Sequence, residues 1–216
     1  MSCAICETRK EKRFCPAVHG RICPQCCGEQ REVTLDCPRE CVYLLQAREH
    51  EKPRPLEDLD RSTLFPKVEI DRQFLHEREQ LILGLSFVLR ESAQADRSLR
   101  DSDLISALNA LTRTYETLAN SGLHIEAPLP NLTHQAIASK VQKMIDEYRT
   151  AEQKQIGYTR LRDSDVLRAL VVLLRIAIGH TSGRPRSRAF VDFLSTQFPE
   201  NPSATASRDE TGILLA

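Results

Sequence analysis

The chain has 216 residues, and its 30 lysines and arginines balance 30 aspartates and glutamates, so the formal net charge is zero. This balance removes a bulk electrostatic attraction to nucleic acid or to an anionic membrane, although it does not exclude a local basic patch. The most apolar stretch, 169–174, lies between Arg168 and Arg175 and is far shorter than the roughly 20 residues of a membrane-spanning helix. The length suits a small module joined to a domain of ordinary size.

All eight cysteines lie between Cys3 and Cys41. A segment of this size cannot bury a self-sufficient core, so it needs disulfides or a metal to order it. The N-terminus has no apolar stretch of signal-peptide length after a basic start, and we therefore expect a cytoplasmic protein. In that reducing compartment, clustered thiols are metal ligands more often than crosslinks.

The spacing of the cysteines predicts two zinc sites. A two-residue spacing lets a tight turn point both thiolates at one ion, and a structural zinc site takes four ligands. Neighbouring side chains diverge, so the adjacent Cys26 and Cys27 are expected to serve different ions. The predicted partition is Cys3, Cys6, Cys23 and Cys26 at one site, and Cys15, Cys27, Cys37 and Cys41 at the other.

The interleaved ligands of residues 1–45 resemble the binuclear, cross-braced zinc fingers as a class, without matching one named family. Cys37 and Cys41, at an expected helix start, resemble the helical half of a treble-clef finger. The lone Cys15 and the doubled Cys26–Cys27 depart from the usual cross-braced spacing. Two alternatives remain open: an iron–sulfur cluster, which four thiolates also hold, and His19 in place of one cysteine.

The sequence divides into a zinc-binding module with a closing helix (1–52), a linker (53–70), a helical bundle (71–198) and a disordered tail (199–216). The Cys-Pro and Cys-Gly steps of residues 1–36 favour metal-binding knuckles over regular structure. A helix is expected to begin near Pro38, with Asp36 as its cap, and to stop at Pro53.

Apolar residues at helical spacing predict five helices in the bundle, over 71–95, 102–119, 137–156, 164–178 and a short stretch from Phe190 to before Pro199. The helix over 164–178 is apolar on nearly every side, so it should lie centrally. The segment 123–132 carries two prolines and is expected to be a crossover loop.

The sequence 99–103, Leu-Arg-Asp-Ser-Asp, recurs at 161–165, and the similarity extends to apolar positions on both sides. A long helix followed by a shorter one is therefore used twice, which predicts an antiparallel bundle of two repeated helical hairpins. The Asp-x-Asp pairs could hold magnesium or calcium. The favoured interpretation is that Asp101 and Asp163 are N-caps, with Asp103 and Asp165 in the first turn.

The predicted fold class is mostly α, with a small irregular double-zinc finger at the N-terminus. The predicted function is that of a non-enzymatic zinc-binding adaptor for a protein partner, because no catalytic triad, phosphate-binding loop or dinucleotide fingerprint is visible. One alternative is nucleic-acid binding through basic residues of the finger, namely Arg9, Lys10, Lys12, Arg13 and Arg21, with Arg184, Arg186 and Arg188 before the last helix as further candidates. Two four-thiolate zinc sites would make the module net acidic, which disfavours that role. The other alternative is a thiol or iron–sulfur redox sensor, with Cys15 or Cys27 as the reactive thiol.

Overall fold

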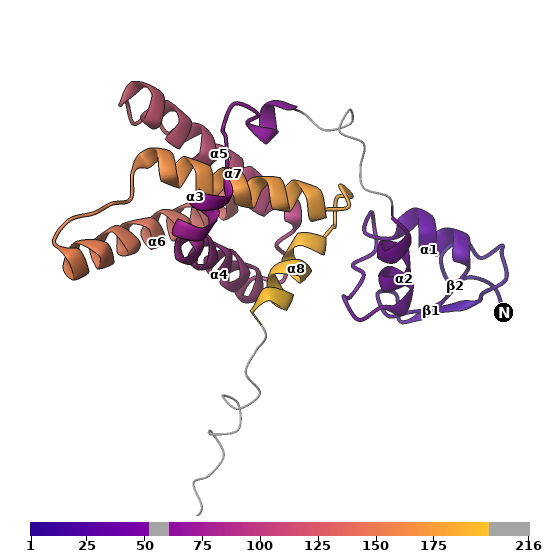
Figure 1. Ribbon diagram of the computed structural model, residues 1–216. Helices are drawn as coiled ribbons and strands as arrows, with labels where there is room; N and C mark the ends of the chain where they lie inside the picture. Colours follow the sequence, from indigo (N-terminus) through magenta and orange to yellow (C-terminus); the bar gives the residue numbers. More distant parts are fainter. Residues whose placement is uncertain (52–60, 199–216) are drawn as a thin grey trace, which may run out of the picture.

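The computed structural model of the protein describes residues 1–51 and 61–198 and is mostly helical, as predicted. Figure 1 shows a small cysteine-rich module beside a larger helical bundle. The module contains β1 (Arg13–Cys15), β2 (Gly20–Ile22), α1 (Pro24–Gln30) and α2 (Val42–His50). The bundle contains the 3-10 helix η2 (Arg61–Leu64), α3 (Arg72–Glu77), α4 (Glu79–Ala95), α5 (Asp101–Ser121), α6 (Leu132–Ile156), α7 (Asp163–His180) and α8 (Ala189–Gln197). The tail 199–216, which is predicted to be disordered, lies outside the described residues. Residues 53–60 of the predicted linker also lie outside them.

The module contains regular structure that the sequence analysis did not predict. Strands β1 and β2 form an antiparallel hairpin in which Arg13 pairs with Ile22 and Cys15 pairs with Gly20. Helix α1 follows directly, with Pro24 in its first turn and Cys23 as its N-cap. The Cys23 sulfur accepts a hydrogen bond from the backbone N–H of Cys26, so one turn both presents the second cysteine pair and starts a helix.

Helix α2 begins at Val42, so the predicted start near Pro38 is wrong. Its N-cap is Cys41, whose side chain makes no capping hydrogen bond. Asp36 does not cap this helix. Its carboxylate instead accepts hydrogen bonds from Arg100 and Arg186 of the bundle.

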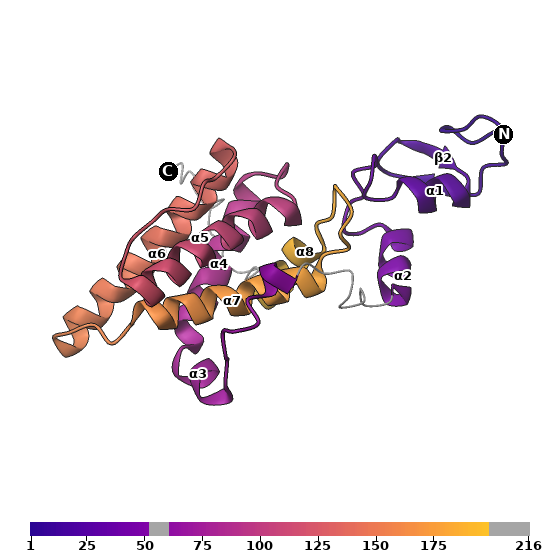
Figure 2. The same cartoon turned by 90° about the horizontal axis from the view of Figure 1, so that it is seen from above.

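The core of the bundle is built around α7, which packs against α4, α5 and α8 (Figures 1 and 2). Leu170, Leu173 and Leu174 of this helix are almost completely buried. The prediction that this segment lies centrally is therefore correct. Phe65, which follows η2, is also buried in this core, and its carbonyl accepts a hydrogen bond from Arg175 of α7.

The predicted helix over 71–95 is interrupted at Arg78, which separates α3 from α4. Arg78 has φ −113° and ψ 18°, outside the helical range. Its guanidinium lies 3.2 Å from the Glu152 carboxylate and 2.9 Å from that of Asp165. These ion pairs hold the side chain of the interrupting residue against two other helices, an arrangement that helical periodicity does not reveal.

Helices α5 and α7 begin at equivalent points of the repeated motif, but their caps differ from the prediction. Asp101 and Asp163 are the first helical residues, and the N-caps are Arg100 and Arg162. The carboxylates of Asp103 and Asp165 lie in the first turn and accept the N–H groups of these two arginines. The capping acceptor is therefore the second aspartate of each motif, because its side chain reaches back to the exposed N–H at the helix start.

Candidate metal centre

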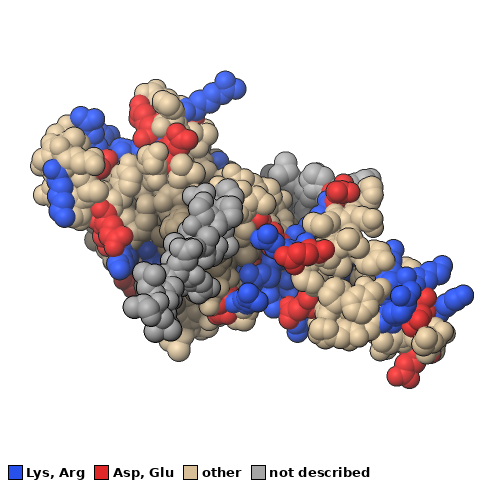
Figure 3. Space-filling model, turned by 90° about the horizontal axis from the view of Figure 1, so that it is seen from below, with Lys and Arg blue, Asp and Glu red and all other residues tan. Residues whose placement is uncertain are grey.

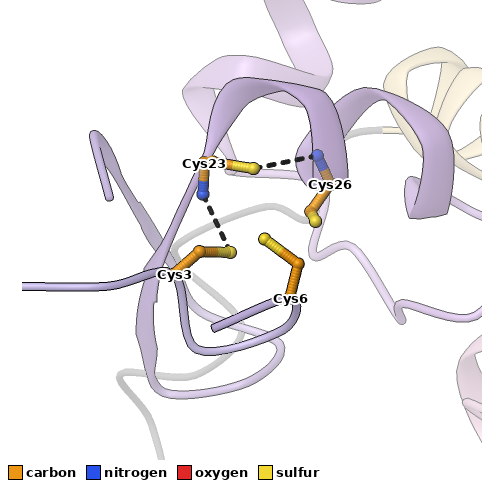
Figure 4. A group of neighbouring side chains, drawn as sticks. All are labelled: Cys3, Cys6, Cys23 and Cys26. Carbon is orange, nitrogen blue, oxygen red and sulfur yellow. Dashed lines mark hydrogen bonds between the residues drawn. The ribbon is translucent and has the colours of Figure 1, made fainter. Parts of the chain in front are cut away.

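The structure brings together the four cysteines predicted for the first site. The sulfur atoms of Cys3, Cys6, Cys23 and Cys26 all lie within 4.8 Å of one another. Figure 4 shows them converging from the N-terminal turn and from the start of α1. Four sulfur atoms at about 2.3 Å from one tetrahedral ion would lie about 3.8 Å apart, so this group needs little movement to hold a metal.

Two short turns position these thiols. In the first turn, the N–H of Glu7 donates to the Cys3 carbonyl, and the N–H of Ile5 donates to the Cys3 sulfur at 3.4 Å. Glu7 has φ 56°, the left-handed conformation that closes the turn. In the second turn, Cys23 and Cys26 lie one helical turn apart at the start of α1. Local backbone structure therefore sets the geometry of both cysteine pairs. For this reason a two-residue spacing between cysteines predicts that their thiols point to the same place.

A long-range hydrogen bond joins the two turns. The N–H of Cys23 donates to the Cys3 sulfur at 3.2 Å (Figure 4). Close by, the N–H of Ala4 donates to the Arg21 carbonyl at 3.0 Å. The β1–β2 hairpin thus carries the second cysteine pair back to the first.

The four thiols differ in acidity. Hydrogen bonds from the Thr8 hydroxyl and from the backbone N–H groups of Arg9 and Thr8 lower the pKa of Cys6 to about 5. Burial raises the pKa of Cys26 to about 12. Burial opposes ionisation of Cys3, but N–H groups of the surrounding turns hold its pKa below the ordinary thiol value. A bound cation would favour the thiolate form of all four, so metal binding would release protons.

Arg9 lies close to this centre. Burial opposes its charged form, but the negative charges of three nearby cysteines, Cys23 first among them, raise the pKa of Arg9. A four-thiolate zinc centre carries a net charge of about −2, so a neighbouring guanidinium would stabilise it. Neither Thr8 nor Arg9 was identified from the sequence as part of the site. Their position directly after the first cysteine pair is the only signal that could have indicated them.

The other four cysteines are less tightly gathered. Cys15 ends β1, Cys27 follows Cys26 in α1, and Cys37 and Cys41 flank the turn before α2. Cys37 is close enough to Cys41 and Cys15 for their charges to interact. The Cys27 sulfur lies 4.0 Å from the guanidinium of Arg31. Within residues 1–51 and 61–198, only the first group of cysteines has all its ligand atoms within 4.8 Å, so the second site stays a prediction.

His19 lies in the turn between β1 and β2, with φ 50° and an exposed side chain. It is not a member of the group formed by Cys3, Cys6, Cys23 and Cys26. That group is complete with four sulfur ligands. The alternative in which His19 replaces one of these four cysteines is therefore not supported.

No known protein family, curated protein or solved structure matches this chain. Among the helices of the described residues, none is both long enough and apolar enough to span a membrane. The geometry of the cysteine group is thus the evidence from which a function can be argued.

Proposed function

We propose that this protein is a non-enzymatic zinc protein of the cytoplasm whose N-terminal module is a structural metal centre and whose bundle serves interaction with a protein partner. The observation that carries the proposal is the convergence of Cys3, Cys6, Cys23 and Cys26 within 4.8 Å. Zinc is favoured because paired cysteine knuckles at a helix start are a common zinc-binding pattern, and four sulfur ligands leave no open position for catalysis. An iron–sulfur cluster is the alternative occupant.

We further propose a second zinc ion bound by Cys15, Cys27, Cys37 and Cys41. The proximity of Cys37 to Cys41 and Cys15 supports this set. Cys15 and Cys27 are both buried in the same apolar cluster as Cys3, Cys23 and Cys26, and Cys37 packs against it. A tetrahedral set of four sulfur ligands would require these thiols to draw together around the ion.

A protein partner is favoured over nucleic acid because many of the candidate basic residues have other contacts. Arg13 stacks over the ring of Tyr43 at 4.6 Å, and Arg21 lies 3.3 Å from Glu11. Near α8, Arg186 pairs with Asp36, and Arg188 donates to the carbonyls of residues 93, 97 and 99. Guanidinium groups engaged in this way are poorly available to phosphates.

Metal analysis of the purified chain tests the proposal. We expect about two zinc ions per chain and no visible absorption, about one in Cys6→Ser, about one in Cys41→Ser, and none in the double variant. A brown protein that absorbs visible light would establish the iron–sulfur alternative. A wild-type chain with one zinc ion that Cys41→Ser retains would remove the second site.

A DNA-binding measurement tests the preference for a protein partner over nucleic acid. Binding to random-sequence DNA should be undetectable at low salt with the zinc-loaded chain. Binding that weakens steeply as salt is added would instead support the nucleic-acid alternative.

A further inference from the structure

The segment 31–36, which joins α1 to the last two cysteines, contacts the bundle. Its partner is the loop 181–188 between α7 and α8. The N–H of Arg186 donates to the Glu32 carbonyl at 2.8 Å, and the guanidinium of Arg184 donates to the Arg31 carbonyl at 2.9 Å. In Figure 3, basic and acidic side chains lie together where the two bodies meet.

Glu32 is the centre of this interface. Its side chain is only 2% exposed, and its two carboxylate oxygens accept hydrogen bonds from different elements. Arg48 of α2 donates to one oxygen at 2.9 Å, and the Ser182 hydroxyl donates to the other at 3.0 Å. Arg48 also donates to Asp192 of α8 at 2.7 Å. A buried carboxylate is stable only while such partners remain in place, so these contacts form or break together.

A second acidic residue extends the interface. Asp36 lies between Arg186, at 2.7 Å, and Arg100 at the start of α5. Asp36 is about half exposed, so these pairs contribute less than those of Glu32. Segment 31–36 thus lies against three arginines of the bundle, because Asp36 pairs with Arg100 and Arg186 and the Arg31 carbonyl accepts a hydrogen bond from Arg184.

The conformation of this segment depends on the cysteine cluster. The carbonyl of Gln30, the last residue of α1, accepts the N–H groups of residues 33, 34 and 35. The backbone of Glu32 lies close to the Cys37 thiol, and Leu35 is buried among the cysteines. Glu32 also has φ 52°, a left-handed conformation that a non-glycine residue holds only when its surroundings impose it. The segment therefore keeps its shape while α1 and the cysteine turns keep theirs.

We infer that the contact between the module and the bundle is a metal-dependent latch, in which metal at the cysteine cluster holds segment 31–36 in the shape that docks on loop 181–188. This inference rests on the proposed metal site and adds a regulatory role to it. Loss of the metal loosens α1, withdraws Glu32 and Asp36 from the bundle, and exposes the arginines that they cover. Whether metal is bound at the cysteine cluster therefore determines whether these arginines of the bundle are exposed.

The amide proton of Arg186 reports directly on docking, because its acceptor is the Glu32 carbonyl of the module. Its hydrogen exchange can be measured by NMR in the full chain, with zinc bound and after removal of zinc by EDTA. We expect exchange at least about tenfold faster without zinc. The amide of Val166, which donates to the Arg162 carbonyl at the start of α7, serves as an internal reference and should keep its rate. Unchanged protection of Arg186 in a chain that has lost its zinc would overturn the latch.

Substitution of Arg48 tests whether a weaker contact between module and bundle also weakens zinc binding. Since coupling is reciprocal, Arg48→Met, which weakens docking, should also weaken zinc affinity, while the zinc stoichiometry is unchanged. Arg39→Met is the matched control, because Arg39 is mostly exposed and, within residues 1–51 and 61–198, its ion-pair partner is its neighbour Glu40. Faster Arg186 exchange with unaltered zinc affinity in Arg48→Met would show that docking and metal binding are independent, which overturns the inference. A wild-type chain that binds no metal would remove the proposed function as well, and metal analysis separates that outcome from the other two.

Discussion

The backbone N–H of Cys23 donates a hydrogen bond to the sulfur of Cys3 at 3.2 Å, across 20 residues of sequence. This bond brings the second cysteine pair against the first. An N–H group aimed at sulfur stabilises a thiolate, so the same contact that folds the module also favours the ligand form of Cys3.

The Thr8 hydroxyl should tune the affinity of the first site. It is hydrogen-bonded to Cys6 and contributes most to the low pKa of that thiol. We expect Thr8→Val to bind zinc about tenfold more weakly at unchanged stoichiometry, because its Cys6 ionises less readily and is held less firmly. Competition with a chromophoric chelator measures this affinity. Thr150→Val is the control, since the Thr150 hydroxyl donates to the Asp146 carbonyl within α6 of the bundle, and equal affinities for the two variants would contradict the prediction.

The two equivalent aspartates of the repeated motif should differ sharply in their contribution to stability. Asp101 is completely buried and accepts hydrogen bonds from the Ser187 hydroxyl and from the N–H groups of Phe190 and Val191. Asp101→Ala leaves these donors without an acceptor and should lower the free energy of unfolding by about 3 kcal/mol. Urea denaturation measures this loss.

Asp163→Ala provides the matched control for that experiment. The Asp163 side chain is 41% exposed and pairs with Arg149. Its removal should cost less than about 1 kcal/mol. Similar losses for the two variants would show that the buried network around Asp101 does not anchor α8.

Glu152 should make the bundle more stable at neutral pH than in acid. One oxygen of its carboxylate accepts the N–H groups of Arg160 and Leu161 and the Thr159 hydroxyl. Burial opposes ionisation, but these donors together with Arg78 lower the pKa of Glu152 below its ordinary value of 4.5. A lowered carboxyl pKa contributes stability that is fully present above 4.5 and is lost as the pH falls through the lower folded value.

The variant Glu152→Gln tests this pH dependence. It should be less stable than wild type by about 1–2 kcal/mol at pH 7. The difference should shrink once the wild-type carboxyl is protonated in strong acid. Denaturant midpoints measured from pH 7 to pH 2 provide the comparison, and a difference that does not change with pH would contradict the assigned role.

Removal of metal should affect the module far more than the bundle. The cysteine-rich cluster and the core of the bundle are separate groups of buried residues. We expect EDTA to remove protease resistance from residues 1–50 while most of the helical circular dichroism signal persists, because α3 to α8 lie in the bundle. Loss of the whole helical signal at the same EDTA concentration would show that the two bodies fold as one unit.

Sequence reasoning worked where the signal is local. The apolar pattern of 164–178 predicted a central helix, and the structure has α7 at Asp163–His180 with most of its sides buried. The two-residue spacings predicted the pairs Cys3–Cys6 and Cys23–Cys26, and the fold brings both to one point. Periodicity and ligand spacing act over a few residues, so a sequence displays them directly.

The errors share a different origin. Helix α1 was missed because cysteine and glycine steps were interpreted as turns, whereas the Cys23 sulfur and Pro24 start a helix. Asp36 was interpreted as a helix cap, but it pairs with Arg100 and Arg186. The break at Arg78 is accompanied by ion pairs to α6 and α7. Each outcome depends on a partner far away in the chain or on a choice between two uses of the same residue.

The sequence by itself determined the helical class of the chain, the position of its central helix and the set of cysteines available for metal. Only the tertiary structure decided which of two identical aspartates is buried and that Glu32 joins the module to the bundle. The physical reason is that the burial and the ion pairs of a side chain depend on which residues the fold places around it. Asp101 and Asp163 have the same local sequence, and only the packing of loop 181–188 and α8 against Asp101 makes them different.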